Sequence, residues 1–150
     1  MQISLHSDYA LRVLMALAAS DRQLSVDDIA QRYGISRNHL AKVSQRLQAE
    51  GYVETFRGRS GGMRLAKSPS AINVGQVVRQ FENLDAFASC FGSGPGCVVH
   101  GPCALKPALN GALDAFLNHL DGYHLGDLIP DSQAFAQRLG LSDRASGTVQ

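Results

Sequence analysis

Three cysteines lie close together in the second half of the chain, and thiols at such spacing can bind a metal. Cys90, Cys97 and Cys103 are separated by six and then by five residues. An odd number of cysteines makes a poor disulfide framework, whereas thiolates are preferred ligands of soft metals. The surrounding segment is rich in glycine and proline, which lets a backbone curl around a metal group. We therefore predict a metal or redox site in the loop 83–104.

The spacing of the cysteines bears on the kind of metal. Zinc sites usually pair two cysteines about two to four residues apart, and the separations here are wider. We favour an iron–sulfur cluster, with zinc and free redox-active cysteines as alternatives. A four-iron cluster normally takes four ligands, so three thiolates leave one place to fill. The candidates for the fourth ligand are His100, Asp8 and His6, and a two-iron cluster with the same ligands is a further alternative.

The first third of the chain carries the pattern of three short helices. Apolar residues of 8–19 recur at helical spacing, with Ser7 as the expected cap. A second helix begins with a capping box over 25–28 and is broken by Gly34. A third runs from Ser36 to about residue 50. Two short helices joined by a tight turn with glycine are the signature of a helix-turn-helix.

The third helix has one apolar side, with Leu40, Val43 and Leu47, and one polar side. The polar side bears groups that can contact base edges and phosphates. The candidate DNA-binding residues of this helix are Arg37, Asn38, His39, Lys42, Gln45 and Arg46. A solvated helix face is the plainer interpretation, but such a face usually includes acidic residues, and here none occurs before Glu50.

The segment 51–66 predicts a β-hairpin with a basic, glycine-rich tip. A hairpin of this kind after a recognition helix is a wing, and its Arg57, Arg59 and Arg64 would reach a phosphate backbone or minor groove. Residues 36–67 carry seven Lys or Arg against two Asp or Glu, which fits a surface that faces a polyanion. Chance clustering of charge on a solvated face is the alternative that charge alone leaves open. We predict a mainly α fold with a small β-hairpin wing, namely a winged helix-turn-helix plus a long dimerisation helix.

The remainder of the chain is expected to hold a dimer together. A short helix capped by Asn73 completes a DNA-binding domain of residues 1–82, and a long amphipathic helix opens the segment 105–130. Because the domain looks complete by residue 82, the apolar face of the long helix lacks an internal partner. We favour packing against a second copy over packing in the core. The tail 131–150 is weakly patterned and expected to be partly disordered.

Composition excludes several classes of protein. Hydrophobic residues make up 45% of the chain and charged residues 18%, which argues against global disorder. No apolar run approaches the ~20 residues that span a bilayer, and no basic leader precedes the first apolar stretch, so we expect a cytoplasmic protein without a membrane partner. The sequence shows no Ser/His/Asp set, no paired catalytic carboxylates and no nucleotide-binding loop. An enzyme is therefore not expected.

The chain resembles the bacterial iron–sulfur winged-helix transcription regulators that include NsrR and IscR. The resemblance covers about residues 1–130 and is carried by the three-cysteine loop and by four further segments. These are SDYALRVL at 7–14, YGISRNHL at 33–40, GYV at 51–53 and RGRSGG at 57–62. IscR-like members use a histidine three residues after the last cysteine. Lys106 occupies that position here, so the chain is more similar to the NsrR-like members.

The resemblance implies a ligand set and a function. It implies that Cys90, Cys97 and Cys103 hold an iron–sulfur cluster, [4Fe-4S] in preference to [2Fe-2S], with Asp8 of the partner subunit as fourth ligand. It further implies a homodimeric repressor of transcription that binds a palindromic double-stranded DNA operator and senses nitric oxide. Nitrosylation or loss of the cluster would release the DNA. The alternatives are a regulator of the same fold that senses iron–sulfur status or redox stress, and a zinc-stabilised DNA-binding module.

Overall fold

The computed structural model of the protein describes residues 2–92 and 97–142. Within these ranges the chain is mainly helical, with one antiparallel hairpin, as the sequence predicts. The elements are α1 (Leu5–Ala19), α2 (Val26–Tyr33), α3 (Arg37–Ala49), β1 (Val53–Phe56), β2 (Gly62–Leu65), α4 (Val74–Phe81), α5 (Leu105–Asp121) and α6 (Ser132–Arg138), with short 3-10 turns η1 (Pro69–Ala71), η2 (Leu84–Ala86) and η3 (Leu125–Leu128). None of the helices in the described part is long and apolar enough to cross a membrane.

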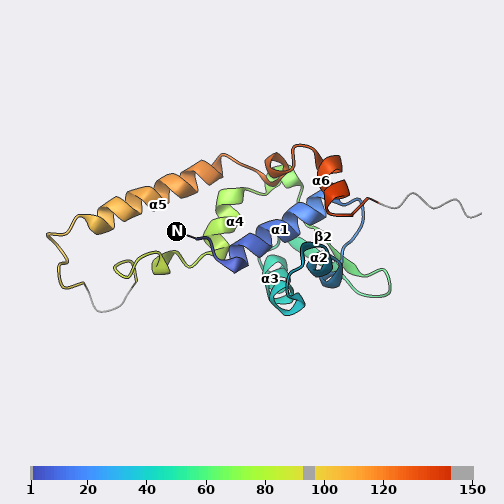
Figure 1. The fold of residues 1–150 in the computed structure, drawn as a ribbon, viewed down its shortest axis with the longest axis horizontal. Coiled ribbons are helices and arrows are strands. Elements are labelled where there is room, and N and C mark those ends of the chain that lie inside the picture. Colours follow the sequence, from blue (N-terminus) through green and yellow to red (C-terminus); the bar gives the residue numbers. More distant parts are fainter. Residues whose placement is uncertain (1, 93–96, 143–150) are drawn as a thin grey trace, which may run out of the picture.

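Helix α1 lies at the centre of the molecule. It contacts α3, α4, α6, η3 and β2. In Figure 1, α3 lies on one side of α1 and α5 on the other, and the start of α5 extends to the end of the molecule that is remote from the hairpin. The cysteine loop therefore sits at one end of the long axis, and the expected DNA-binding elements sit towards the other.

The start of α1 differs from the sequence prediction. The helix begins at Leu5, and its cap is Ser4, whose backbone is extended and whose Oγ accepts a hydrogen bond from the amide of Ser7 at 3.2 Å. Ser7, the predicted cap, is fully buried within the first turn. The prediction was wrong by one turn because the apolar stripe of the helix begins only at Ala10, while the polar first turn continues α1 towards the N-terminus.

The predicted capping of α2 is confirmed. The amide of Asp28 donates to Ser25 Oγ at 3.0 Å, and the amide of Ser25 donates to Asp28 Oδ2 at 3.3 Å. These two bonds satisfy donors that the first turn of a helix otherwise leaves free. Gly34 ends the helix with a φ of 67°, a left-handed conformation that favours glycine. The turn between α2 and α3 is therefore set by local sequence.

The hairpin is joined to the helical core through its second strand. Val53 pairs with Leu65, and Phe56 pairs with Gly62. The amide of Met63 donates to the carbonyl of Leu24 at 2.7 Å, and the amide of Leu24 donates back at 3.0 Å. This bridge fixes the base of the hairpin beside the segment that precedes α2, so the orientation of the hairpin tip relative to α3 is determined by the core.

The hydrophobic core does not end at residue 82. Leu125, Ala136 and Leu141 join the core that is formed around α1, and α6 packs against α1. The view that the core is complete by residue 82 was therefore wrong, and the tail 131–150 begins with a helix that the sequence analysis missed. Within the seven residues of this helix only Ala136 is buried, so its sequence carries no apolar pattern long enough to reveal it. The disorder expected over 142–150 falls, apart from Ser142, on residues that lie outside the described ones.

Helix α5 packs along α4, and this contact covers only part of the apolar face of α5. Leu117 is buried, whereas Leu113, Phe116 and Leu120 are half-buried. At the start of the helix Leu105 is 58% exposed. The long helix thus has an internal partner near its C-terminal end and an uncovered apolar surface nearer to the cysteine loop.

Candidate metal centre and nucleic-acid interface

The three cysteines line one hollow of about 470 Å³. It lies between the loop that follows α4 and the first turns of α5, and His100 also lines it. All three cysteines are free thiols; Cys97 and Cys103 are exposed and Cys90 is half-buried. The amide of Leu105 donates a hydrogen bond to Cys103 Sγ at 3.4 Å. The fold therefore brings the predicted thiol ligands to one site, with a backbone donor already directed at a sulfur.

The arrangement of the thiols bears on what they can hold. Within residues 2–92 and 97–142, no three His, Cys, Asp or Glu side chains are grouped closely enough to bind a single metal ion. In a [4Fe-4S] cluster each thiolate binds a different iron, so its ligands lie farther apart than the ligands of one zinc ion. Three unpaired soft donors around one open hollow therefore fit a cluster better than zinc.

The candidates for the fourth ligand are placed very differently. His100 lines the hollow with the cysteines, whereas Asp8 and His6 lie in the first turn of α1 and do not line it. Asp8 Oδ2 instead accepts a hydrogen bond from Arg12 Nε at 3.0 Å. Within one chain, therefore, the fold does not bring Asp8 to the thiols.

Arg12 connects the start of α1 to the end of α2. Its guanidinium lies 5.5 Å from the centre of the Tyr33 ring, and the Tyr33 hydroxyl donates to the Arg12 carbonyl at 3.1 Å. Burial raises the pKa of Tyr33 to about 12, so its phenol stays neutral and keeps its proton for that bond. Asp8, Arg12 and Tyr33 thus form a contact chain from α1 into the helix-turn-helix.

The predicted recognition surface on α3 is open to solvent. Leu40, Val43 and Leu47 are buried on its inner side, as predicted. The residues exposed along its outer side are Arg37, Asn38, His39, Lys42, Gln45 and Arg46. Arg37 forms an ion pair with Asp27, but both side chains are more than 60% exposed. Such an exposed pair is weak, so it leaves the guanidinium free to turn to a phosphate.

The hairpin places its arginines beside α3. Arg57 and Arg59 are exposed in the turn between β1 and β2, and an open hollow of about 460 Å³ separates this hairpin from α3. Arg64 lies on β2, where it pairs with Glu54 at 3.3 Å and covers the ring of Phe56 at 4.4 Å. The arginines of the tip therefore have more freedom to contact a ligand than Arg64.

Arg46 differs from its neighbours on α3. Its guanidinium donates a hydrogen bond to the backbone carbonyl of Gln80 and lies 4.7 Å from the centre of the Phe81 ring. Both partners belong to the last turn of α4. The charged end of Arg46 is therefore directed at another helix of the same chain rather than outward with Lys42.

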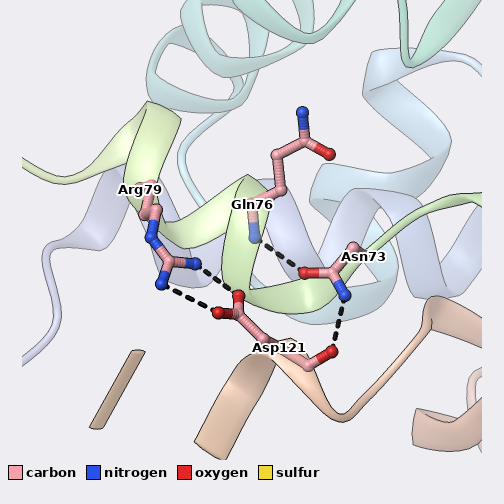
Figure 2. A network of polar contacts seen from close by, with 4 residues as sticks. All are labelled: Asn73, Gln76, Arg79 and Asp121. Atoms are coloured by element: carbon pink, nitrogen blue, oxygen red, sulfur yellow. Dashed lines mark hydrogen bonds and ion pairs between the residues drawn. The ribbon is translucent and has the colours of Figure 1, made fainter. Parts of the chain in front are cut away.

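Sequence reasoning missed a polar network that joins α4 to the end of α5 (Figure 2). The Arg79 guanidinium donates two hydrogen bonds to the Asp121 carboxylate, one of them at 2.9 Å, and Asn73 Nδ2 donates to the Asp121 carbonyl at 2.7 Å. The hydrogen bond from Arg79 lowers the pKa of Asp121 below its ordinary 3.8. No local pattern links residues 42 positions apart, so nothing in the sequence indicated this pair.

Comparison with known proteins identifies a family of transcriptional regulators that this chain matches over most of its length. Residues 3–131 match the Rrf2 family, described as iron-dependent transcriptional regulators. The chain is 46% identical to the HTH-type transcriptional regulator NsrR of Bacillus licheniformis over 86% of its length and 92% of the relative's. It is 44% identical to that of Bacillus subtilis over 95% and 100%.

Solved structures agree with the sequence comparison. CymR, the global cysteine regulator of B. subtilis, is similar with a TM-score of 0.66 and 28% identity, over 85% of this chain and 95% of that one. T. potens IscR is similar with a TM-score of 0.70 and 25% identity, over 90% of each chain. These relatives are regulators rather than enzymes, as expected. The chain belongs to the Rrf2 family of transcriptional regulators.

Proposed function

We propose that this protein is a homodimeric, DNA-binding repressor of transcription, which carries an iron–sulfur cluster and releases its DNA in response to nitric oxide. One observation carries the proposal: three free thiols line a single hollow in a chain that also exposes a basic helix-turn-helix face. The similarity to NsrR regulators supports the choice of signal. We expect the protein to act in the cytoplasm.

The DNA-binding surface consists of the outer side of α3 and the hairpin. Helix α3 enters a major groove, where Asn38, Lys42 and Gln45 contact bases and Arg37 and His39 lie near the helix start. The hairpin follows the adjoining backbone or minor groove. Its contributing residues are Arg57, Arg59 and Arg64. The support is that these side chains are exposed on α3 and on the hairpin, which line the two sides of one open hollow.

The cluster site consists of Cys90, Cys97 and Cys103, with Asp8 of the partner subunit as the fourth ligand of a [4Fe-4S] cluster. When bound, the cluster supplies iron to which nitric oxide can bind. A carboxylate oxygen is a harder donor than a thiolate and is more weakly held by such iron. Asp8 is therefore the ligand that this protein can exchange, while the three thiols keep the cluster attached to the loop.

The contacts of Asp8 suggest how the DNA-binding elements respond. In the single chain Asp8 is bound to Arg12, and Arg12 lies against Tyr33 at the end of α2. The Asp8 carboxylate cannot bind Arg12 and a metal in another subunit at the same time. Loss of the metal bond would therefore return the carboxylate to Arg12, beside Tyr33 at the end of α2. Asp8 thus has two alternative partners, and two alternative states of one contact are what a switch requires.

The dimer rests on the uncovered face of α5. Leu105 is exposed, and Leu109 and Leu113 are only half-buried in one chain. A second copy that packs there removes this apolar surface from water. Two-fold symmetry of the protein then calls for a palindromic operator with half-sites about one helical turn apart, or a multiple of that spacing.

The decisive experiment uses protein that is purified without air. We expect iron and acid-labile sulfide in equal amounts, four of each per chain, and visible absorption that is lost on titration with nitric oxide. A duplex enriched from random DNA by the loaded protein should dissociate over the same range of nitric oxide. Material that is free of iron, or that keeps its duplex at full nitrosylation, would overturn the proposal.

The same assay distinguishes the alternative sensors. Because the family is described as iron-dependent, parallel titrations with hydrogen peroxide, with air and with an iron chelator are needed. Release of the duplex by one of these agents, but not by nitric oxide, would assign the protein to iron or redox sensing. Zinc in place of iron would assign it to a structural metal site.

A further inference from the structure

Helix α4 is clamped to the end of α5 by Arg79 and by a close approach of the two backbones. The two-fold hydrogen bonding of Arg79 to Asp121 is the charged part of this contact (Figure 2). A Cβ atom at Gly75 would lie 2.9 Å from the backbone nitrogen of Asp121 and 2.0 Å from its Oδ1. Only a residue without a side chain allows this approach, so the joint between α4 and α5 is tight.

The residues that follow Arg79 contact α3 and the base of the hairpin. The Gln80 carbonyl accepts the hydrogen bond from Arg46, and its side-chain oxygen accepts one from the Tyr52 hydroxyl. The Phe81 ring is buried and lies under the Arg46 guanidinium. Arg46 on α3 and Tyr52 before β1 are therefore both held by α4.

The last residue of this turn reaches the start of α1. Glu82 Oε1 accepts a hydrogen bond from the amide of Ser4 at 2.7 Å, and Ser4 is the cap of the helix that carries Asp8. Four consecutive residues, 79–82, thus contact α5, α3, the hairpin base and α1. Among the contacts described above, only these residues link α5, α3 and α1 at one point.

We propose that residues 79–82 couple α5 to α3, and that Arg46 is the positioning residue through which α3 is held, not a residue that binds DNA. The proposal rests on the proposed function, because it assumes that α3 binds DNA. Helix α4 has eight residues, of which five are buried, so it moves as one body. A displacement of α5 at Asp121 therefore shifts Gln80 and Phe81, and Arg46 transmits the shift to α3.

The planar guanidinium suits this role. It stacks on the Phe81 ring and at the same time donates to the Gln80 carbonyl, and a lysine ammonium cannot reproduce both contacts. A phosphate contact, by contrast, requires only the positive charge. Arg46→Lys and Arg46→Ala therefore separate the two roles, and Lys42→Ala, on the outward side of the same helix, is the matched control.

The first measurement is the salt dependence of binding to the enriched duplex. Lys42→Ala removes a positive charge that is proposed to lie in the major groove. We therefore expect the slope of log K against log salt to fall, by at most about 0.9, the value for one neutralised phosphate. For Arg46→Ala and Arg46→Lys we expect the wild-type slope with affinity lowered about fivefold in both. A reduced slope in Arg46→Ala, or wild-type affinity in Arg46→Lys, would show that Arg46 binds DNA and would overturn its positioning role.

The second measurement is the ratio of duplex affinities with and without the cluster. We expect this ratio to fall towards one, by about fivefold, in Arg46→Ala and in Asp121→Asn, with no further fall when the two are combined. Fully additive effects, or unchanged ratios, would overturn the coupling. Circular dichroism melting is recorded first, and if Asp121→Asn fails to fold, Arg79→Lys takes its place. A wild-type ratio of one would overturn both the proposed switching and the coupling, whereas the salt slopes would still decide the role of Arg46.

Discussion

The carboxylate of Asp8 accepts a hydrogen bond from Arg12 one turn further along α1, at 3.0 Å. The residue proposed to bind iron in a partner subunit therefore has a competing cation in its own chain. Both side chains are partly exposed, at 32% for Asp8 and 42% for Arg12, so the pair is weak enough to open. A ligand that is to be exchanged needs such a second partner, one that binds it weakly enough to release it to the metal.

Replacing Asp8 should loosen the cluster without removing it. In Asp8→Ala the three thiols remain, so we expect the loaded protein to form but to lose iron to a chelator at least several times faster than wild type. Arg12→Gln removes the competing cation, and we expect it to lose iron no faster than wild type. Iron release followed by visible absorption measures both. If Asp8→Ala keeps its iron and its duplex as wild type does, Asp8 is not a ligand.

The exposed arginines of the hairpin should contribute to DNA affinity chiefly through charge. Loss of one phosphate contact lowers the salt slope by about 0.9 and weakens binding to most sequences alike. We expect this from Arg59→Ala, because Arg59 is exposed in the turn between β1 and β2. Arg138→Ala removes an exposed charge from α6 and should leave the slope unchanged. Equal slopes in the two variants would exclude a hairpin contact at Arg59.

Gly75→Ala should destabilise the protein. The added methyl group would meet the backbone of Asp121 at 2.9 Å, and backbone cannot turn away as a side chain can. Overpacking of this kind costs about 1–3 kcal/mol of the free energy of unfolding. Gln76→Ala, at the next position and exposed, should change it little. The measurement is denaturant unfolding of both variants, and equal stabilities would show that α4 and α5 are not tightly joined.

The sequence predicted elements whose causes are local. The capping box at Ser25, the left-handed Gly34 and the cap at Asn73 each depend on residues within one turn, and all three are confirmed. The gathering of the thiols also follows from the sequence, because all three lie within fourteen residues of one loop and a loop can bring such residues together. Interactions between residues that are close in the sequence are therefore enough to predict the helix-turn-helix and the gathering of the cysteines.

The sequence could not predict contacts that arise from packing. Helical periodicity places Arg46 at one margin of the polar side of α3, but it cannot show where the guanidinium points; the position of α4 decides that. The Arg79–Asp121 pair has the same origin, since it exists only after α5 has folded back along α4. Helix α6 was missed because few apolar residues mark it.

The Arg79–Asp121 pair should make stability depend on acid. The hydrogen bond from Arg79 holds the pKa of Asp121 below its ordinary 3.8, so the unfolded chain takes up this proton at higher pH than the folded one. The contribution of the pair is therefore complete above that value and is lost as the pH falls through the lower, folded-state pKa. We expect Asp121→Asn to be less stable than wild type at neutral pH, with the difference shrinking in acid. A difference that is independent of pH would show that the charge is not involved.

Ser44→Ala should not weaken the protein although Ser44 is buried on α3. Its Oγ has no hydrogen-bond partner among the described residues, and a buried hydroxyl without a partner costs free energy. Removing it, in a helix where alanine is the better residue, should raise the free energy of unfolding by up to about 1 kcal/mol. Ser7→Ala is the matched control, because Ser7 Oγ accepts a hydrogen bond from Ser4 Oγ at 3.3 Å and its loss should destabilise α1. Thermal and denaturant unfolding compare the two, and a loss in Ser44→Ala as large as in Ser7→Ala would show that the Ser44 hydroxyl is bonded in solution.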